Sequence, residues 1–253
     1  MDGIQSFIEQ YPIGATAAAA SVVGFGLAAR IGWSVFYSGS GFFAPVIRTI
    51  DQNDAIAFSF DDGPTEPFTS QILDILADHK SHASFFVIGR HVEANKKLLR
   101  RMVDEGHTIG NHTWDHHHQG IMGSLAYWVG QVEKTSAAIE EAAGVRPMLF
   151  RAPMGFKTPH QAKAVAINGA KYVAWRLRAW DTMNVGFESV VKHIGENARG
   201  GDIVTMHDGL EPSRAHCSQA QTVNALPEIL KTMKDRGLRC ISLQEALNFH
   251  VYC

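Results

Sequence analysis

The clearest structural signal in the chain is the segment Ala55-Ile-Ala-Phe-Ser-Phe-Asp-Asp-Gly-Pro64. Its first six residues form a short, mostly apolar run, and turn-forming residues follow at once. This combination predicts a buried strand over residues 55–60 that ends at the two aspartates. Strands of this kind are typical of parallel sheets whose faces are covered by helices.

Similar apolar runs recur along the chain, and helical patterns separate them. The further predicted strands cover residues 83–88, 108–110, 148–152, 172–175 and 203–207. The predicted helices cover residues 71–77, 92–105, 124–143 and 219–236. Alternation of strand and helix indicates βαβ units and a parallel sheet. The expected fold is therefore α/β, a distorted (β/α) barrel of about seven parallel strands, preceded by an N-terminal apolar helix.

Length and composition suit a globular enzyme and exclude some partners. The 253 residues are 45% hydrophobic and 19% charged, enough to build one large domain. The net charge of -2 and the lack of a long basic run argue against a nucleic-acid partner. Cys217, Cys240 and Cys253 are too few and too widely spaced for a disulfide framework or a Cys-based zinc site. We expect reduced thiols or a single bridge, so any metal must use His and carboxylate ligands.

The N-terminal region differs from the rest of the chain. Residues 13–37 are rich in Ala and Gly and contain one charge, Arg30. This length suits a membrane anchor or an interfacial helix, and a soluble helix docked on the domain is the alternative. Asp2 and Glu9 precede it, which argues against a cleaved signal peptide. We expect an anchor and connector over residues 1–54 and a catalytic domain over 55–253. Arg30 and Arg48 weakly favour a cytoplasmic domain, but the orientation stays open, as does a soluble cytoplasmic or periplasmic form.

Two adjacent carboxylates, Asp61 and Asp62, follow the first predicted strand. In α/β barrels, the carboxyl ends of the strands form the active face. A bound metal would relieve the repulsion between the two carboxylates and keep the one that is not a ligand ionised as a base. A polar Asp-Asp-Gly-Pro turn without such a role is the alternative.

Histidines gather after the strand predicted at residues 108–110, in Gly110-Asn-His-Thr-Trp-Asp-His-His-His118. His112 and His116 are four residues apart, and on a helical turn their imidazoles would lie on one face. Two His and one carboxylate are a common catalytic metal set that leaves a position open for water. The pattern predicts a divalent-metal site, with a solvated His-rich loop as the alternative.

Three further polar groups stand at or just beyond later predicted strands. Arg151 can hydrogen-bond a carboxylate, Asp181 can orient a histidine, and His207 can act as a general acid. The alternatives are a surface arginine, a capping aspartate and a histidine paired with Asp208 in a turn. Together with the aspartates and histidines above, these groups are what a metal-assisted hydrolase needs.

These motifs, in this order, resemble the polysaccharide deacetylase family, also called carbohydrate esterase family 4 or the NodB homology domain. The resemblance covers residues 56–247. It implies a distorted barrel and a divalent cation, most often zinc. It also implies that Asp62, His112 and His116 are the metal ligands.

The same resemblance implies the reaction and its catalytic groups. Asp61 would be the base, Arg151 would contact that base, and Asp181 would orient His207, the acid. A backbone N–H near Met154 would stabilise the oxyanion. The implied reaction removes N-acetyl groups from an amino sugar of an N-acetylglucosamine-containing glycan, so the expected partner is a carbohydrate. The oligomeric state stays open.

The sequence departs from the family's usual pattern at three places. Ala-Pro-Met follows Arg151 where Pro-Pro-Tyr is usual, Thr182 stands where Trp is usual, and Thr205 precedes His207 where a Leu is often found. The last two positions help to line the acetyl pocket in the family. A deformylase, or an amide hydrolase acting on a lipid-linked sugar or a non-sugar substrate, is therefore the alternative. A non-catalytic carbohydrate-binding protein would have lost catalytic positions, and all of them are present.

Overall fold

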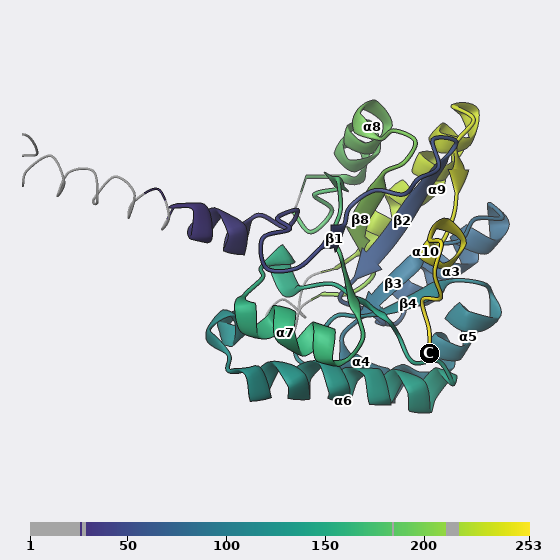
Figure 1. Cartoon of the computed structure of the whole chain (residues 1–253). Helices are drawn as coiled ribbons and strands as arrows, with labels where there is room; N and C mark the ends of the chain where they lie inside the picture. Colours follow the sequence, from purple (N-terminus) through teal and green to yellow (C-terminus); the bar gives the residue numbers. More distant parts are fainter. Residues whose placement is uncertain (1–25, 27–28, 184, 211–217) are drawn as a thin grey trace, which may run out of the picture.

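The computed structural model describes residues 26, 29–183, 185–210 and 218–253 (Figure 1). Its sheet has nine strands in the order β1-β6-β5-β4-β3-β2-β8-β7, with β9 beside β2. Every pairing between named strands is parallel. The sheet is an open half-barrel, which confirms the predicted distorted (β/α) barrel. The strands are β1 (Val46–Ile47), β2 (Ala55–Asp61), β3 (Ser84–Val87), β4 (Thr108–Asn111), β5 (Leu149–Phe150), β6 (Lys171–Val173), β7 (Leu177–Arg178), β8 (Ile203–His207) and β9 (Arg239–Cys240).

Helices follow most of the strands and cover the sheet. The α-helices are α3 (Phe68–Asp78), α4 (Gly89–Val92), α5 (Lys96–Asp104), α6 (Leu125–Ala143), α7 (Pro159–Ile167), α8 (Phe187–Asn197), α9 (Ala220–Asp235) and α10 (Leu243–Ala246). Three short 3-10 helices are η1 (Glu93–Asn95), η2 (His118–Met122) and η3 (Pro153–Gly155). In Figure 1, α8 and α9 lie beside β8, and α6 runs along the opposite end of the molecule with α7 next to it. The single helix predicted over 92–105 is thus divided into α4, η1 and α5.

Strand β2 lies inside the sheet, and its burial explains why its sequence is apolar. All seven of its residues are buried between β3 and β8. Ile56, Phe58 and Phe60 pack into one core, which helices α3, α5, α8 and α9 also line. Ala55 and Ala57 pack into a second core on the other face. A strand buried on both faces has no solvent-facing positions, so its sequence reads as a continuous apolar run.

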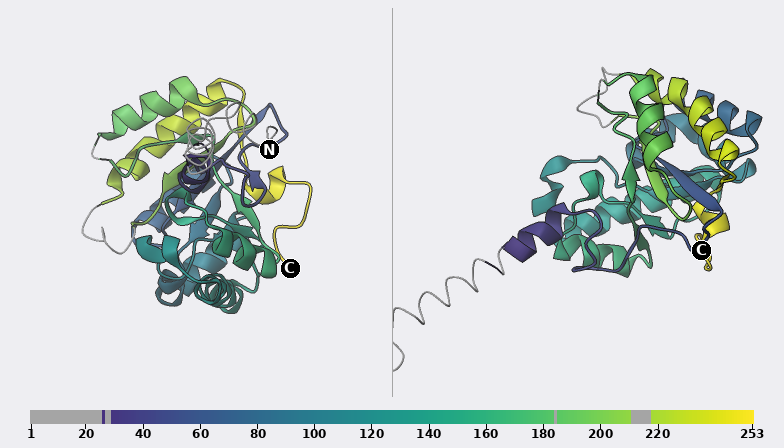
Figure 2. Two further views of the ribbon diagram at one scale, coloured as in Figure 1. Left: turned by 60° about the vertical axis from the view of Figure 1, so that its left-hand side comes forward. Right: turned by 90° about the horizontal axis from the view of Figure 1, so that it is seen from above.

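The N-terminal region is only partly described. Most of the apolar stretch 13–37 lies outside the described residues, and its described end is a helix over residues 29–36 (Figure 2). Among the helices that the structure describes, none is both long and apolar enough to cross a membrane. The predicted anchor and the domain division at residue 55 stay predictions. The connector does join the sheet, because β1 pairs with β6.

Candidate active site

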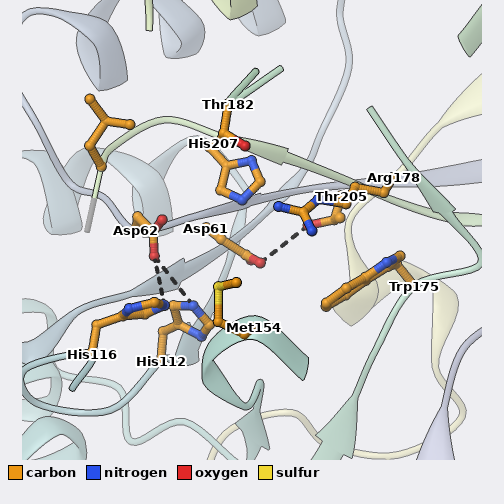
Figure 3. Close-up of a pocket in the computed structure, with 11 residues that line it drawn as sticks. Asp61, Asp62, His112, His116, Met154, Trp175, Arg178, Thr182, Thr205 and His207 are labelled. Atoms are coloured by element: carbon orange, nitrogen blue, oxygen red, sulfur yellow. Dashed lines mark hydrogen bonds and ion pairs between the residues drawn. The ribbon is translucent and has the colours of Figure 1, made fainter. Parts of the chain in front are cut away.

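Asp62, His112 and His116 come together at the carboxyl ends of β2 and β4 (Figure 3). Oδ1 of Asp62 lies 3.4 Å from Nε2 of His112 and 3.4 Å from Nε2 of His116. All three side chains are buried. Ligand atoms about 2.1 Å from a tetrahedral cation are separated by about 3.4 Å, so this spacing fits a shared metal ion.

Two details of hydrogen bonding also fit a cation. Oδ1 of Asp62 is buried and accepts no hydrogen bond, which leaves its lone pairs free for a metal. Nδ1 of His112 lies 2.8 Å from the backbone carbonyl oxygen of Arg151. A carbonyl oxygen can only accept, so Nδ1 carries the proton and Nε2 presents a lone pair toward Asp62. The three side chains therefore form a donor set suited to a divalent cation.

His112 and His116 do not lie on a helix, so the expected helical turn is wrong. After β4 the chain enters a tight loop in which Thr113 and His116 have positive φ values of 68° and 52°. Gln131 of α6 holds this loop, because its Oε1 accepts hydrogen bonds from the backbone N–H groups of Trp114 and Asp115 at 2.9 and 3.3 Å. This positioning role of Gln131 was not predicted from the sequence.

Asp61 is held in a buried ion pair. Nη1 of Arg151 donates to Oδ1 of Asp61 at 2.6 Å, and the arginine side chain is fully buried. The same nitrogen also donates to the hydroxyls of Ser59 and Thr205. The Thr205 hydroxyl in turn donates to Oδ2 of Asp61 at 3.2 Å. This arrangement fixes Asp61 beside the Asp62, His112 and His116 donor set, and Arg151 links the two groups because its carbonyl oxygen also holds His112.

The turn after β2 is shaped by close backbone contacts. Asp62 has a positive φ of 74°, an uncommon conformation for a residue with a side chain. A Cβ at Gly63 would lie 2.0 Å from the carboxylate of Asp208, and one at Gly209 would lie 2.4 Å from the carbonyl oxygen of Asp62. Glycine is required at both positions, which brings the turns after β2 and β8 together.

His207 is oriented by Asp181 at the end of β8. Its Nδ1 lies 2.9 Å from Oδ1 of Asp181, and its backbone N–H donates to the other carboxylate oxygen at 2.7 Å. Thr222 of α9 donates to the same oxygen. Nδ1 therefore carries a proton, and Nε2 is the nitrogen left for chemistry. The structure thus brings all seven predicted site residues into one region.

Comparison with known proteins identifies the family. The family model described as polysaccharide deacetylase matches residues 49–173. A peptidoglycan-N-acetylglucosamine deacetylase of Bacillus cereus is 35% identical over 205 residues, which cover 77% of this chain and 88% of that protein. The chain belongs to the polysaccharide deacetylase family. Members of this family are hydrolases that act on carbon–nitrogen bonds other than peptide bonds.

Two further relatives agree with this polysaccharide deacetylase assignment. A chitooligosaccharide deacetylase of Sinorhizobium fredii is 34% identical over 210 residues, covering 79% of this chain and 96% of that protein. A crystal structure of a peptidoglycan N-acetylglucosamine deacetylase in complex with 4-naphthalen-1-yl-N-oxidanyl-benzamide superposes with a TM-score of 0.74. That match has 26% identity and covers 81% of this chain and 94% of the other.

The active-site pocket is lined by three residues that were predicted from the sequence to lie near the acyl group, and by three that were not predicted. Met154, Thr182 and Thr205 line it together with Asp61, His207 and the Asp62, His112 and His116 donor set. Trp175, Arg178 and Leu210 also line it. Trp180 does not line this pocket and is 48% exposed, so it does not replace the bulky side chain that Thr182 lacks.

The paired histidine predicts how activity depends on pH. Burial lowers the pKa of His207, but the Asp181 carboxylate and its hydrogen bond raise it more, to about 9. A raised pKa keeps the imidazole protonated up to that pH, so we expect kcat/KM to fall as the pH rises through about 9. In Asp181→Asn the strongest raising influence is gone, and the fall should move to lower pH. A pH–rate profile of both proteins tests this prediction. If kcat/KM falls at the same alkaline pH in both proteins, His207 is not the acid.

Proposed function

We propose that the protein is a divalent-metal-dependent hydrolase that removes N-acetyl groups from an amino sugar of an N-acetylglucosamine-containing oligo- or polysaccharide. The observation that carries this proposal is the single pocket shared by the Asp62, His112 and His116 donor set, Asp61 and His207. The relatives named above, which are deacetylases of peptidoglycan and chitooligosaccharides, support the choice of substrate.

The protein side chains divide the proton transfers between them. When bound, the cation, which we propose is zinc, polarises the amide carbonyl and lowers the pKa of water. Asp61 accepts a proton from the water that attacks the carbonyl carbon. His207 donates a proton to the amide nitrogen as the C–N bond breaks. The products are acetate and a free amino sugar.

The hydrogen-bond partners of Asp61 and His207 support the roles of these two residues as base and acid. Arg151 and Thr205 fix the Asp61 carboxylate, and Asp181 keeps His207 in the tautomer whose Nε2 serves the reaction. Met154 lines the pocket with a positive φ of 55°, in the segment after β5 from which we propose that a backbone N–H contacts the oxyanion.

One assay tests both which acyl group is removed and which sugar carries it. Purified protein should contain about one divalent ion per chain and release acetate from N-acetylglucosamine oligomers, and a chelator should abolish this release because it removes the cation. The matched N-formyl oligomer measures acyl selectivity in the same assay. Bound metal with formate release and no acetate release would replace the deacetylase proposal by the deformylase alternative. Release that is insensitive to the chelator would contradict metal dependence.

A further inference from the structure

Arg178 extends from β7 into the active-site pocket (Figure 3). In the sheet it is paired with Thr205 of β8, and the backbone N–H of Ala179 donates to the Thr205 carbonyl at 3.0 Å. Paired residues of adjacent strands lie about 5 Å apart. The hydroxyl of Thr205 hydrogen-bonds Asp61, so the arginine side chain enters the pocket with only strand β8 between its own strand and that of the proposed base.

Among the described residues, no anion lies beside the guanidinium of Arg178. Its Nε is buried and has no hydrogen-bond partner, and no carboxylate of the described residues lies within 4.0 Å of it. Two arginines next to these strands are paired with carboxylates: Arg176 bonds Asp202, and Arg151 bonds Asp61. An unsatisfied buried N–H opposes folding, so a donor left unpaired in a substrate pocket points to a ligand that supplies the acceptor.

Trp180 stacks against Arg178 without lining the pocket itself. The guanidinium lies over the indole ring, with Cζ 5.0 Å from the ring centroid. Trp180 adopts a positive φ of 61°, which is unfavourable for a bulky residue. Stacking on an aromatic face restrains a guanidinium while leaving its N–H edge free to donate. The pair therefore presents a fixed hydrogen-bonding fork.

The carboxylates near Arg178 in the site already have partners of opposite charge or belong to the proposed metal site. The carboxylate of Asp61 faces Arg151, that of Asp181 faces His207, and Asp62 belongs to the proposed metal site. Arg178 thus adds a positive charge that no described side chain balances. A guanidinium in this setting favours a planar or tetrahedral oxyanion that accepts two hydrogen bonds.

We propose that Arg178 is a specificity-determining residue that binds an oxyanion substituent, a carboxylate or a phosphate, on the acetamido sugar substrate. The substrate class is then an anionic amino-sugar glycan and not a neutral one. This inference rests on the proposed deacetylase function. Arg178 contributes to substrate recognition, and the proton transfers stay with Asp61 and His207.

Three disaccharides with the same acetamido sugar test the proposal. One is neutral N,N'-diacetylchitobiose, one is the same disaccharide with a 1-phosphate, and one contains N-acetylmuramic acid, whose lactyl ether carries a carboxylate. We expect wild-type kcat/KM to be higher for at least one anionic disaccharide than for the neutral one. Arg178→Gln should lower the anionic-to-neutral ratio of kcat/KM by roughly 10- to 100-fold, mainly through KM. Arg178→Lys, which keeps the charge but loses the fork, should recover part of that ratio.

Lys192→Gln provides the matched control, because it removes one positive charge from an exposed side chain of α8. The anionic-to-neutral ratio of kcat/KM in this variant should equal that of the wild type. A preference for the phosphate or for the muramic substrate identifies which oxyanion is bound. An unchanged ratio in both Arg178 variants, or equal wild-type rates on all three disaccharides, would overturn the inference while leaving the deacetylase function intact. Acetate release from none of them would instead reject the proposed function, and the inference with it.

Discussion

Replacing Asp61 with asparagine is expected to lower kcat by about 10²- to 10⁴-fold without changing the amount of bound metal. Activity falls because the general base is removed: an amide cannot accept the proton of the attacking water. The metal is expected to stay because Asp62, His112 and His116 are untouched. Acetate release and elemental analysis on the same preparation measure both quantities.

The fold of Asp61→Asn should survive because the amide oxygen can still accept the hydrogen bond from Arg151. Leaving a buried charge without its partner costs about 3–5 kcal/mol, so stability needs its own control. Asp202→Asn is suitable, because Asp202 is a buried partner of Arg176 at the opposite end of β8. That control should lose stability in a thermal melt but keep kcat. An Asp61→Asn protein with wild-type kcat would falsify the assignment of the base.

The central strands and the polar groups at their ends were predictable from the sequence. Strand β2 has no solvent-facing residue, so its apolar run stands out and ends at Asp61 and Asp62. Parallel strands direct their carboxyl ends to one edge of the sheet, so residues far apart in sequence were expected to meet there. The structure brings Asp61, Asp62, His112, His116 and His207 to one pocket.

Short strands and local loop geometry could not be predicted in the same way. Strand β7 has two residues, too few to show a period, so Arg178 was not recognised as a pocket residue. Strands β1 and β9 were missed for the same reason. The spacing of His112 and His116 also fits a helix, but positive φ values at Thr113 and His116 bring the two rings together in a loop instead. Backbone conformations of this kind depend on tertiary contacts such as those of Gln131.

Replacing His112 with alanine is expected to remove the bound metal and, with it, detectable acetate release. Losing a side chain that only hydrogen-bonds a metal ligand lowers metal affinity by about 10- to 100-fold. Losing a ligand itself should therefore lower metal affinity by more than that. The remaining Asp62 and His116 supply only two donors. Elemental analysis after dialysis measures the metal, and a titration with zinc measures the residual affinity.

His107→Ala is the matched control, because His107 and His112 flank the same strand, β4, at opposite ends. Both side chains are buried, but burial lowers the pKa of His107 to about 4, and its Nδ1 accepts a hydrogen bond from the backbone of Ala83. Its loss should reduce stability and leave the metal bound. Asp61→Asn is expected to separate metal binding from activity, whereas His112→Ala is expected to remove both. If His112→Ala keeps a full equivalent of metal after dialysis, the cation binds elsewhere and the 3.4 Å cluster is not its site.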